Sequence, residues 1–227
     1  MKNLPFTKYA LTGSPVVCPI CGGTKRTIIN KYDRRFKILP HAKCEACALV
    51  RHEFMPSDKQ LSDYYSKSYR RDYQMVSSGP TLKHIKKRVS EAKSRLARLE
   101  PYLKKNPKVL DFGCGSGEFI ELLQSKGALS QGFEPGELYA SYARDQKGLS
   151  VQNCGWENYE CEDKMNVITS FHVFEHLVDP QTAFQKAVSW LEPDGLIYVE
   201  VPNLANLLNL KGFGSLHIAH TLGFGRY

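Results

Sequence analysis

The amino-acid sequence predicts an α/β protein in which a small zinc ribbon precedes a parallel, doubly wound sheet. Two observations lead to this fold class. An apolar run and an aspartate stand directly before three alternating glycines and a helical pattern in residues 108–120, "KVLDFGCGSGEFI". Two Cys-x-x-Cys pairs occur near the N-terminus. A strand, a glycine loop and a helix in this order form the first unit of such a sheet, and paired cysteines are typical zinc ligands.

The four N-terminal cysteines have the spacing of a metal site. They form two C-x2-C pairs separated by 22 residues, namely Cys18, Cys21, Cys44 and Cys47. Two such pairs can surround one ion, and four sulfur ligands leave no open position, which indicates a structural Zn2+. Two disulfides are the alternative that a reducing compartment disfavours. β-branched and aromatic residues between the pairs predict short strands, and we expect His41 and His52 to lie on the surface.

Composition places the chain among globular proteins. Of its 227 residues, 42% are hydrophobic and 24% are charged, which are ordinary values. No apolar run approaches the roughly 20 residues that span a bilayer, and the N-terminal residues lack the apolar core of a secretory signal. We therefore expect a cytoplasmic protein without a membrane partner.

The charge of the chain changes sign at the glycine-rich stretch. Residues 1–108 contain 24 Lys and Arg against 8 Asp and Glu, a net charge of +16, whereas residues 109–227 contain 7 against 15, a net charge of −8. This change predicts a domain boundary. Together with the cysteine pairs and the basic segment, it leads us to expect three consecutive parts, namely a zinc ribbon in 1–60, a basic helical linker in 61–104 and a main domain in 105–227. The basic half favours nucleic acid or a nucleotide-linked substrate as partner, or is a solvated surface.

A basic helix is predicted between the two parts. Apolar residues recur every three or four positions on one helical face, at Leu82, Ile85, Val89, Ala92, Leu96, Leu99 and Tyr102. Lysines and arginines, Arg95 and Arg98 among them, occupy the other face. We expect the apolar face to pack on the main domain. The preceding residues 63–74 interleave tyrosines with basic residues. Such a segment could stack on a base or sugar, form an ordered lid, or be a plain linker.

The glycine loop indicates the class of ligand. Nicotinamide-binding folds use G-x-G-x-x-G, but the position of the third glycine here is Glu118, and its carboxylate would repel a pyrophosphate. The ligand should therefore lack phosphates and carry a group that pairs with a carboxylate. S-adenosyl-L-methionine has these properties. The segment 111–117, "DFGCGSG", matches the first motif of class I methyltransferases, D/E-x-G-x-G-x-G, and the chain resembles that family over roughly residues 105–205.

The resemblance implies a Rossmann-like sheet with the donor site along its strand ends. Glu134 would end the second strand and bind both ribose hydroxyls of the donor. The third strand, near 149–153, is faint, so the residue that contacts adenine stays open. The donor-binding residues that the resemblance implies are Asp111, Gly113, Gly115, Gly117, Phe133, Glu134, Phe171 and His172.

A motif of histidine and carboxylate follows the predicted fourth strand. His172, Glu175 and His176 would stand where open α/β sheets bind their ligands. Methyl transfer to oxygen or carbon needs an aligned acceptor and loss of a proton, so His176 is the predicted base and Glu175 its orienting group. The segment resembles the EH pairs of sugar methyltransferases and ubiquinone-pathway O-methyltransferases. A metal site on one helical face and a purely structural role are the alternatives.

A four-cysteine module followed by a methyltransferase domain with an EH pair resembles the sugar C-methyltransferase family. This resemblance implies a nucleotide-linked sugar or another small hydroxylated metabolite as acceptor, in polysaccharide or secondary-metabolite biosynthesis. The second hypothesis is an RNA or protein methyltransferase that uses the basic half. The third is a non-catalytic donor-binding protein, because only one further helix fits after residue 203. The last strands of the family's sheet are then expected to be missing or supplied by a partner subunit.

Overall fold

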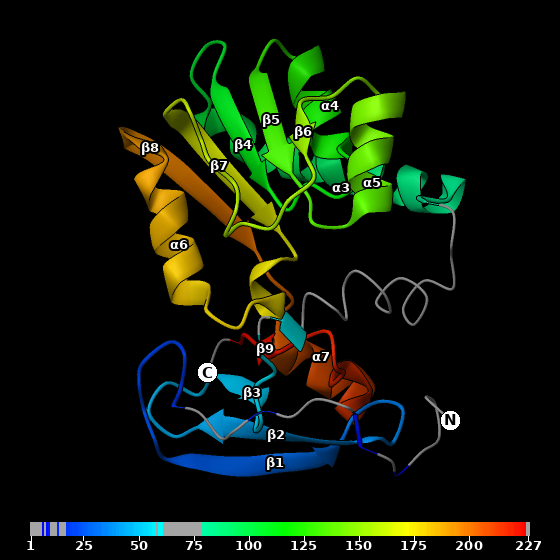
Figure 1. Cartoon of the computed structure of the whole chain (residues 1–227), viewed down its shortest axis with the longest axis vertical. Coiled ribbons are helices and arrows are strands. Elements are labelled where there is room, and N and C mark those ends of the chain that lie inside the picture. The colour runs from blue at the N-terminus through cyan, green and yellow to red at the C-terminus, as the bar shows by residue number, and fades with distance from the viewer. Residues whose placement is uncertain are drawn as a thin grey trace. The chain divides into compact units, whose positions relative to one another are not determined.

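The chain forms two compact units in the computed structural model, which describes residues 6, 8–9, 13, 17–57, 59–60 and 79–225 (Figure 1). The ribbon unit contains Met1–Asp63, His172–Thr182 and Val201–Tyr227. The sheet unit contains Tyr64–Phe171 and Ala183–Glu200. The tyrosine-rich segment 63–74, predicted to stack, to form a lid or to be a linker, lies outside the described residues.

The two units are not consecutive along the chain. The sequence predicted a linear division into 1–60, 61–104 and 105–227, whereas two segments from the last of these parts join the ribbon unit. They do so because the strand β9 (Leu222–Gly223) pairs with the N-terminal strand β3 (Val50–His52). A division by charge and composition cannot detect such a long-range pairing.

The sheet unit contains a five-stranded sheet in which every pairing is parallel. The strand order is β6-β5-β4-β7-β8, and the strands are Val151–Gln152, Leu129–Phe133, Lys108–Phe112, Met165–Phe171 and Leu191–Glu200. The chain runs outward from β4 to β6 and then returns to β7 on the other side of β4. Ligands of open α/β sheets bind at the carboxyl ends of the strands where the order reverses in this way. The predicted α/β fold is therefore confirmed, including the faint third strand.

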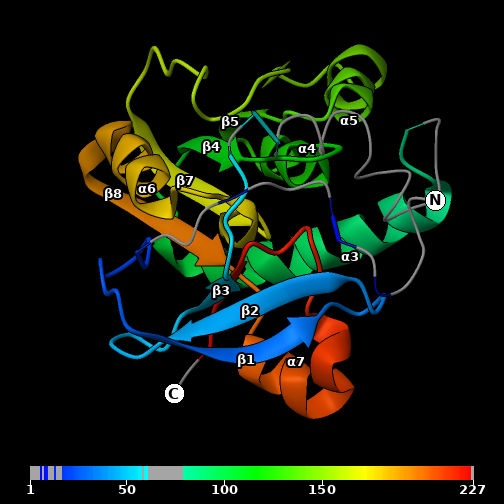
Figure 2. The same cartoon turned by 60° about the horizontal axis from the view of Figure 1, so that its bottom comes forward.

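Helices cover both faces of this sheet. After β4 and β5 come α4 (Glu118–Ser125) and α5 (Glu137–Ser141), and a π-helical turn, η2, continues α5 over Tyr142–Gln146. The views of Figures 1 and 2 place α6 (Pro180–Ser189) on the opposite face of β7 and β8 from α3 (Leu82–Leu99). Among the described residues, no helix combines the length and the apolar character needed to cross a bilayer.

The predicted basic helix is α3, followed by the short helix η1 (Glu100–Tyr102). Its residues Ala92, Leu96 and Leu99 pack in one cluster with core residues of β4, α4 and β7, so the predicted apolar face is confirmed over the C-terminal half of α3. At its ends the prediction is wrong, since Leu82 is 78% exposed and Tyr102 is 70% exposed.

One arginine of the predicted solvated face of α3 is buried instead. Arg95 Nη2 lies 2.6 Å from a carboxylate oxygen of Glu200, at the end of β8. The guanidinium group also lies over the ring of Phe171, 4.2 Å from its centroid. Arginine suits this position because its planar group can stack on a ring and pair with a carboxylate at the same time. Arg95 therefore fastens α3 to the ends of β7 and β8.

The ribbon unit contains a four-stranded antiparallel sheet of order β1-β2-β3-β9. β1 (Arg26–Tyr32) and β2 (Ile38–Cys44) confirm the strands predicted between the cysteine pairs, and Figure 2 shows them side by side. α7 (Leu204–Lys211), the helix that the sequence allowed after residue 203, packs Leu204 and Leu208 on β3. The described part of this unit also contains the short helices η3 (Phe174–His176) and η4 (Gly212–Ser215).

Candidate functional sites

The glycine loop joins β4 to α4 at the carboxyl end of the sheet. Gly115 has φ of +57°, and a Cβ atom added there would meet no atom within 4 Å. Gly117 has φ of +81°, and a Cβ atom there would lie 2.5 Å from Leu149 Cδ1. The two glycines thus have different roles. Gly117 allows the start of α4 to pack closely on Leu149, whereas Gly115 leaves open space beside the main chain. Such space at a helix N-terminus suits a ligand that approaches the backbone.

Glu134 lies directly beside this loop. Gly115 N donates a hydrogen bond to one carboxylate oxygen of Glu134 over 3.1 Å, and Gly136 N donates to the other over 2.8 Å. The side chain of Asn153, next to β6, donates to the Glu134 carbonyl over 2.9 Å. The glycine loop and Glu134, the residue predicted to bind the ribose of the donor, are therefore neighbours in the structure. Asn153 was not predicted, although it follows the third strand directly.

Asp111 is buried behind the loop. Only 3% of its surface is exposed, and the hydroxyl of Thr169 on β7 donates to its Oδ1 over 2.7 Å. Burial raises the pKa of Asp111 to about 7, and the hydrogen bond from Thr169 opposes this rise only in part. The side chain of Glu118 is buried close by, and Ser116 donates to its Oε2 over 2.8 Å. Two buried carboxyl groups thus lie beside the loop.

The raised pKa of Asp111 leads to a pH dependence of stability. The folded state binds the proton more tightly than the unfolded state, whose pKa is near 3.8. The contribution of Asp111 to stability is therefore largest at low pH and falls as pH rises from about 4 to about 7, by on the order of 4 kcal/mol. Asp111→Asn should remove this fall, as measured by urea unfolding between pH 5 and 8.

The control for this prediction is Asp194→Asn. Asp194 is exposed and its pKa is lowered by Lys104, so its substitution should leave the fall between pH 5 and 8 in place. Parallel stability curves for wild type and Asp111→Asn across this range would contradict the assignment.

The two phenylalanines of the predicted donor set have packing partners. Phe133 is 1% exposed and its ring centroid lies 4.7 Å from that of Phe112 and 4.6 Å from that of Tyr159. Phe171 packs edge-on against Phe119 at 5.0 Å and carries Arg95 on its face. Packing contacts alone account for the positions of both rings. A contact of either ring with the methyl donor therefore stays a prediction.

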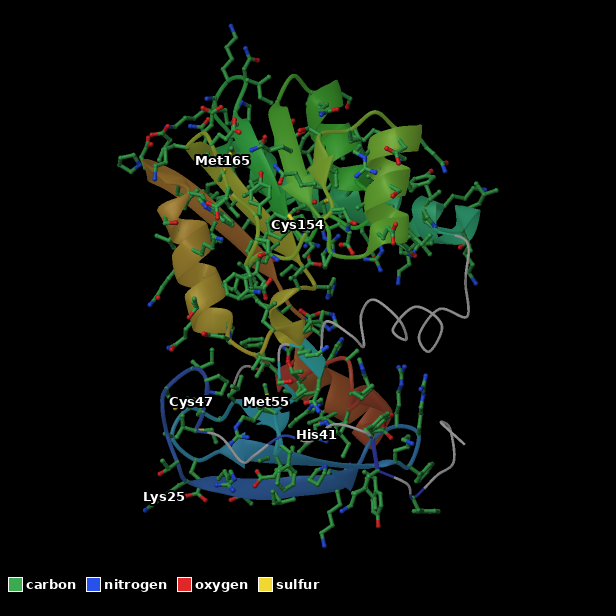
Figure 3. The ribbon with its side chains drawn as sticks, viewed as in Figure 1. Lys25, His41, Cys47, Met55, Cys154 and Met165 are labelled. Carbon is green, nitrogen blue, oxygen red and sulfur yellow. The ribbon has the colours of Figure 1, made fainter. Side chains whose placement is uncertain are left out.

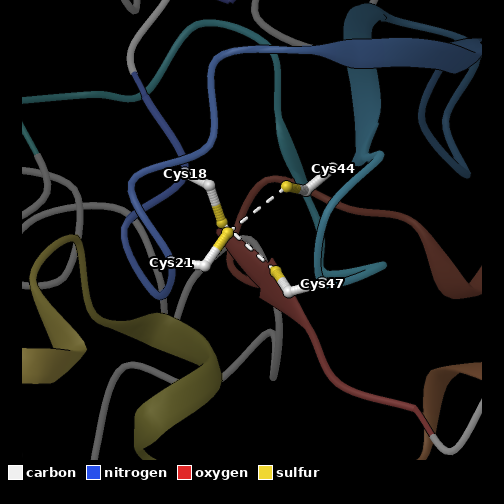
Figure 4. A group of neighbouring side chains, drawn as sticks. All are labelled: Cys18, Cys21, Cys44 and Cys47. Carbon is white, nitrogen blue, oxygen red and sulfur yellow. Dashed lines mark hydrogen bonds between the residues drawn. The ribbon is translucent and has the colours of Figure 1, made fainter.

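The four N-terminal cysteines come together in the ribbon unit (Figure 4). Their sulfur atoms all lie within 4.8 Å of one another, with Cys18 3.5 Å from Cys47 and Cys21 3.6 Å from Cys44. A tetrahedral zinc ion with bonds of about 2.3 Å separates its sulfur ligands by about 3.8 Å. All seven cysteines of the chain are free thiols in the structure. The arrangement therefore fits a metal ion and not the two disulfides considered above.

The backbone around these cysteines forms two equivalent turns. Gly22 N donates to the Cys18 carbonyl over 2.9 Å, and Ala48 N donates to the Cys44 carbonyl over 3.0 Å. Gly22 and Ala48 both have positive φ, at 69° and 63°. Backbone N–H groups of Cys47 and Ala46 lower the pKa of the Cys44 thiol to about 7. Each turn thus aims two sulfur atoms at one point, although burial raises the pKa of the Cys47 thiol to about 12.

The predicted base and its neighbours belong to the ribbon unit. Glu175 is 1% exposed, and its Oε1 lies 3.4 Å from His172 Nδ1, 3.7 Å from His176 Nε2 and 4.0 Å from His220 Nε2. His176 Nδ1 donates to the carbonyl of Ala219 over 2.5 Å. The main-chain carbonyl of Ala219, rather than Glu175, is therefore the hydrogen-bond acceptor that fixes the ring of His176.

His172 has an unusual backbone for a residue that is not glycine. Its φ is +59°, directly after β7. Such a conformation is uncommon outside glycine, and clusters at functional sites. The structure therefore brings His172, Glu175 and His176 together in one unit, whereas Asp111, the loop glycines and Glu134 lie together in the other.

A cluster of buried histidines was missed by the sequence analysis. His41 and His52, expected on the surface, are 2% and 0% exposed, and their rings lie 5.0 Å apart (His41 is labelled in Figure 3). Burial lowers the pKa of His52 to about 4. The His217 carbonyl lies 3.3 Å from His52 Nε2. The expectation was wrong because β9 and the residues before it cover β2 and β3, which the sequence around the cysteines does not reveal.

Comparisons with known proteins agree with the fold of the sheet unit. Residues 83–223 match the model of a family described as "Methyltransferase domain". The chain belongs to this family. The methyltransferase domain therefore includes α3, the whole parallel sheet and the C-terminal segments that complete the ribbon unit.

Two curated relatives are ubiquinone biosynthesis O-methyltransferases. The protein of Coxiella burnetii is 28% identical over 108 residues, which are 44% of this chain and 45% of the relative. The protein of Actinobacillus pleuropneumoniae is 32% identical over 108 residues, 42% of this chain and 46% of the relative. The matched region thus spans about half the length of these relatives.

One solved structure supports the fold of the methyltransferase domain. The plantazolicin methyltransferase BpumL in complex with SAH has a TM-score of 0.50 and 17% identity, over 71% of this chain and 63% of that chain. At this identity the likeness concerns the fold.

Proposed function

We propose that the chain transfers a methyl group from S-adenosyl-L-methionine to a small acceptor. The observation that carries this proposal is the open main chain at Gly115, whose N–H group is 3.1 Å from the Glu134 carboxylate. Donor binding would replace the hydrogen bonds of Glu134 to the loop by bonds to the two ribose hydroxyls. The buried carboxyl groups of Asp111 and Glu118 would face the cationic part of the donor. Membership of the methyltransferase domain family supports this assignment.

The proposed acceptor is a nucleotide-linked sugar or another small hydroxylated metabolite, in polysaccharide or secondary-metabolite biosynthesis. The basic N-terminal half, with a net charge of +16 over residues 1–108, suits a diphosphate. The ribbon unit also contains a cavity of about 510 Å³ against the first cysteine turn, lined by residues that include Cys18, Met55 and Val178. Cavities of this size commonly hold small molecules.

The experiment that tests this function uses labelled donor and competing acceptors. Purified chain is incubated with S-adenosyl-L-methionine carrying a tritiated methyl group, and with a panel of nucleotide-linked sugars or a mixed RNA. Label transferred to a sugar supports the proposal, whereas label on RNA favours the nucleic-acid alternative. Donor binding without transfer to any acceptor, including proteins of a cell extract, would favour a binding protein.

His176 is the proposed proton acceptor for this reaction. Because its Nδ1 donates to the Ala219 carbonyl, the lone pair of the ring is on Nε2, where a base needs it. His176→Ala should lower methyl transfer by roughly 100-fold or more, the usual contribution of general base catalysis. The affinity for S-adenosyl-L-methionine, measured by calorimetry, should stay within about twofold of wild type.

The matched control is His84→Ala. His84 lies on α3 and packs its ring against Tyr139, 5.2 Å away, so its loss removes a histidine outside the proposed site. Equal rates for wild type and His176→Ala would exclude His176 as the base.

A further inference from the structure

The first residue of α4, Glu118, has a buried carboxylate with an unsatisfied oxygen. The residue is 5% exposed, and the hydroxyl of Ser116 donates to its Oε2 over 2.8 Å. Its Oε1 is also buried and accepts no hydrogen bond within the described part of the chain. A buried carboxylate normally has donors or a counter-charge for both of its oxygens. The N-terminus of α4 stabilises a negative charge at this position, but Oε1 still lacks a donor.

Lys147 compensates the charge of Glu118 incompletely. Its Nζ lies 4.0 Å from Glu118 Oε1 but only 2.5 Å from a carboxylate oxygen of Glu121, one turn further along α4. Lys147 follows the π-helical turn η2, in a segment that packs on the glycine loop through Leu149. The lysine is therefore shared between two carboxylates and lies closer to the exposed one.

The charge of Glu118 acts on the glycine loop. Three peptide units separate Glu118 from Gly115, so the Cα atoms of these residues are at most about 11 Å apart. Gly115 is the position that leaves open space beside the main chain. Burial is the main cause of the raised pKa of Asp111 and of Cys114, and the negative charge of Glu118 adds to both. A ligand beside the loop therefore lies within the field of this carboxylate.

The methyl donor and its product differ in charge. Methyl transfer breaks the bond between sulfur and the methyl group, and the electron pair of that bond stays on sulfur. The cationic sulfonium thus becomes a neutral thioether, while the acceptor gains the methyl group and loses a proton. A fixed negative charge beside the site stabilises the bound donor and not the bound product. Because product release limits the turnover of many enzymes, such a charge favours the exchange of product for new donor.

We propose that Glu118 makes the donor site prefer the cationic donor to its neutral product. This inference rests on the proposed function, because it assigns a role at the donor site of the methyltransferase. A unit charge about 10 Å away, at an effective dielectric constant of about 20, favours a cation by about 15-fold, and compensation by Lys147 reduces the expected preference to roughly three- to tenfold.

The test is calorimetric titration of the full chain with three ligands, namely S-adenosyl-L-methionine, S-adenosyl-L-homocysteine and sinefungin. Sinefungin has a carbon atom with an ammonium group in place of the sulfonium, so it keeps the positive charge and transfers no methyl group. Glu118→Gln keeps the shape of the side chain and removes its charge. It should weaken the binding of both cationic ligands by roughly three- to tenfold and leave the affinity for S-adenosyl-L-homocysteine within about twofold.

Glu137→Gln is the matched control. Glu137 is the first residue of α5, as Glu118 is of α4, but its side chain is exposed. Solvent and salt screen an exposed charge, so the ratio of the dissociation constants of product and donor should stay within about twofold of wild type. Lys147→Met is a second variant with the opposite sign, since removal of the lysine should raise this ratio.

Three results would overturn the inference and leave the donor site in place. They are an equal loss of affinity for all three ligands in Glu118→Gln, unchanged affinities in that variant, and a lower ratio in Lys147→Met. A wild-type chain that binds none of the three ligands would instead overturn the proposed function itself.

Discussion

Gly115→Arg is expected to abolish binding of S-adenosyl-L-methionine. The arginine side chain would fill the open space beside the loop and place its cation where the donor carries its own positive charge. It would also pair with Glu134, whose carboxylate is 3.1 Å from Gly115 N, and so compete with the ribose hydroxyls. Calorimetric titration should show at least about a 100-fold loss of affinity, which corresponds to about 2.7 kcal/mol.

Gly148→Arg is the matched control for this substitution. Gly148 has φ of +67° and no atom within 4 Å of an added Cβ, so it matches Gly115 in backbone strain and in free space. Each substitution should cost about 1 to 2 kcal/mol of stability, because a left-handed conformation is strained for arginine. Only Gly115→Arg should lose the donor. If both variants bind the donor like wild type, the loop is not the donor site.

We propose that the four cysteines bind a structural zinc ion, and removal of that ion should unfold the ribbon unit. Structural zinc sites contribute about 10 to 16 kcal/mol of apparent binding free energy, which is comparable to the whole stability of a small domain. The two cysteine turns carry positive φ at Gly22 and at Ala48, and without metal their remaining support is backbone hydrogen bonds and the small cluster that contains Cys18 and Cys44, which contribute less than the metal. Residues 17–57 should therefore lose protection from hydrogen exchange after treatment with a strong chelator.

Cys47→Ser tests the same site by mutation. Cys47 is exposed, so serine there changes the metal ligand and little of the packing. The variant should lose one zinc ion per chain and show the same exchange pattern as chelated wild type. Cys161→Ser, which removes a thiol from the sheet unit, should keep both the ion and the protection. A ribbon that stays protected without metal would contradict a structural role for zinc.

Local sequence patterns predicted the sheet unit well, and physical reasons explain why. β4, the glycine loop and α4 are contiguous, so their order and the steric demands at Gly117 are visible in a short stretch. The same holds for the two cysteine pairs, since each turn is built from consecutive residues. Glu134 could be placed because a parallel β-α-β unit brings the next strand end beside the first.

The rest depended on contacts that local patterns do not contain. Arg95 follows the helical period of a solvated face, yet it is buried because Glu200 and Phe171 meet it from β8 and β7. His41 and His52 are buried because distant residues cover them. His220 lies 4.0 Å from Glu175 because the pairing of β9 with β3 and the hydroxyl of Thr221 hold their segments together, and no local spacing in the sequence shows this contact.

The pairing of β9 with β3 also determines when the N-terminal sheet can be completed during synthesis. Val50 pairs with Gly223, so the third strand must wait for its neighbour until residue 223 has left the ribosome. Closing so long a loop slows folding. Until then His41 and His52 lack their cover from the C-terminal segment, and the newly made ribbon has only the pairing of β1, β2 and β3 and its cysteine turns.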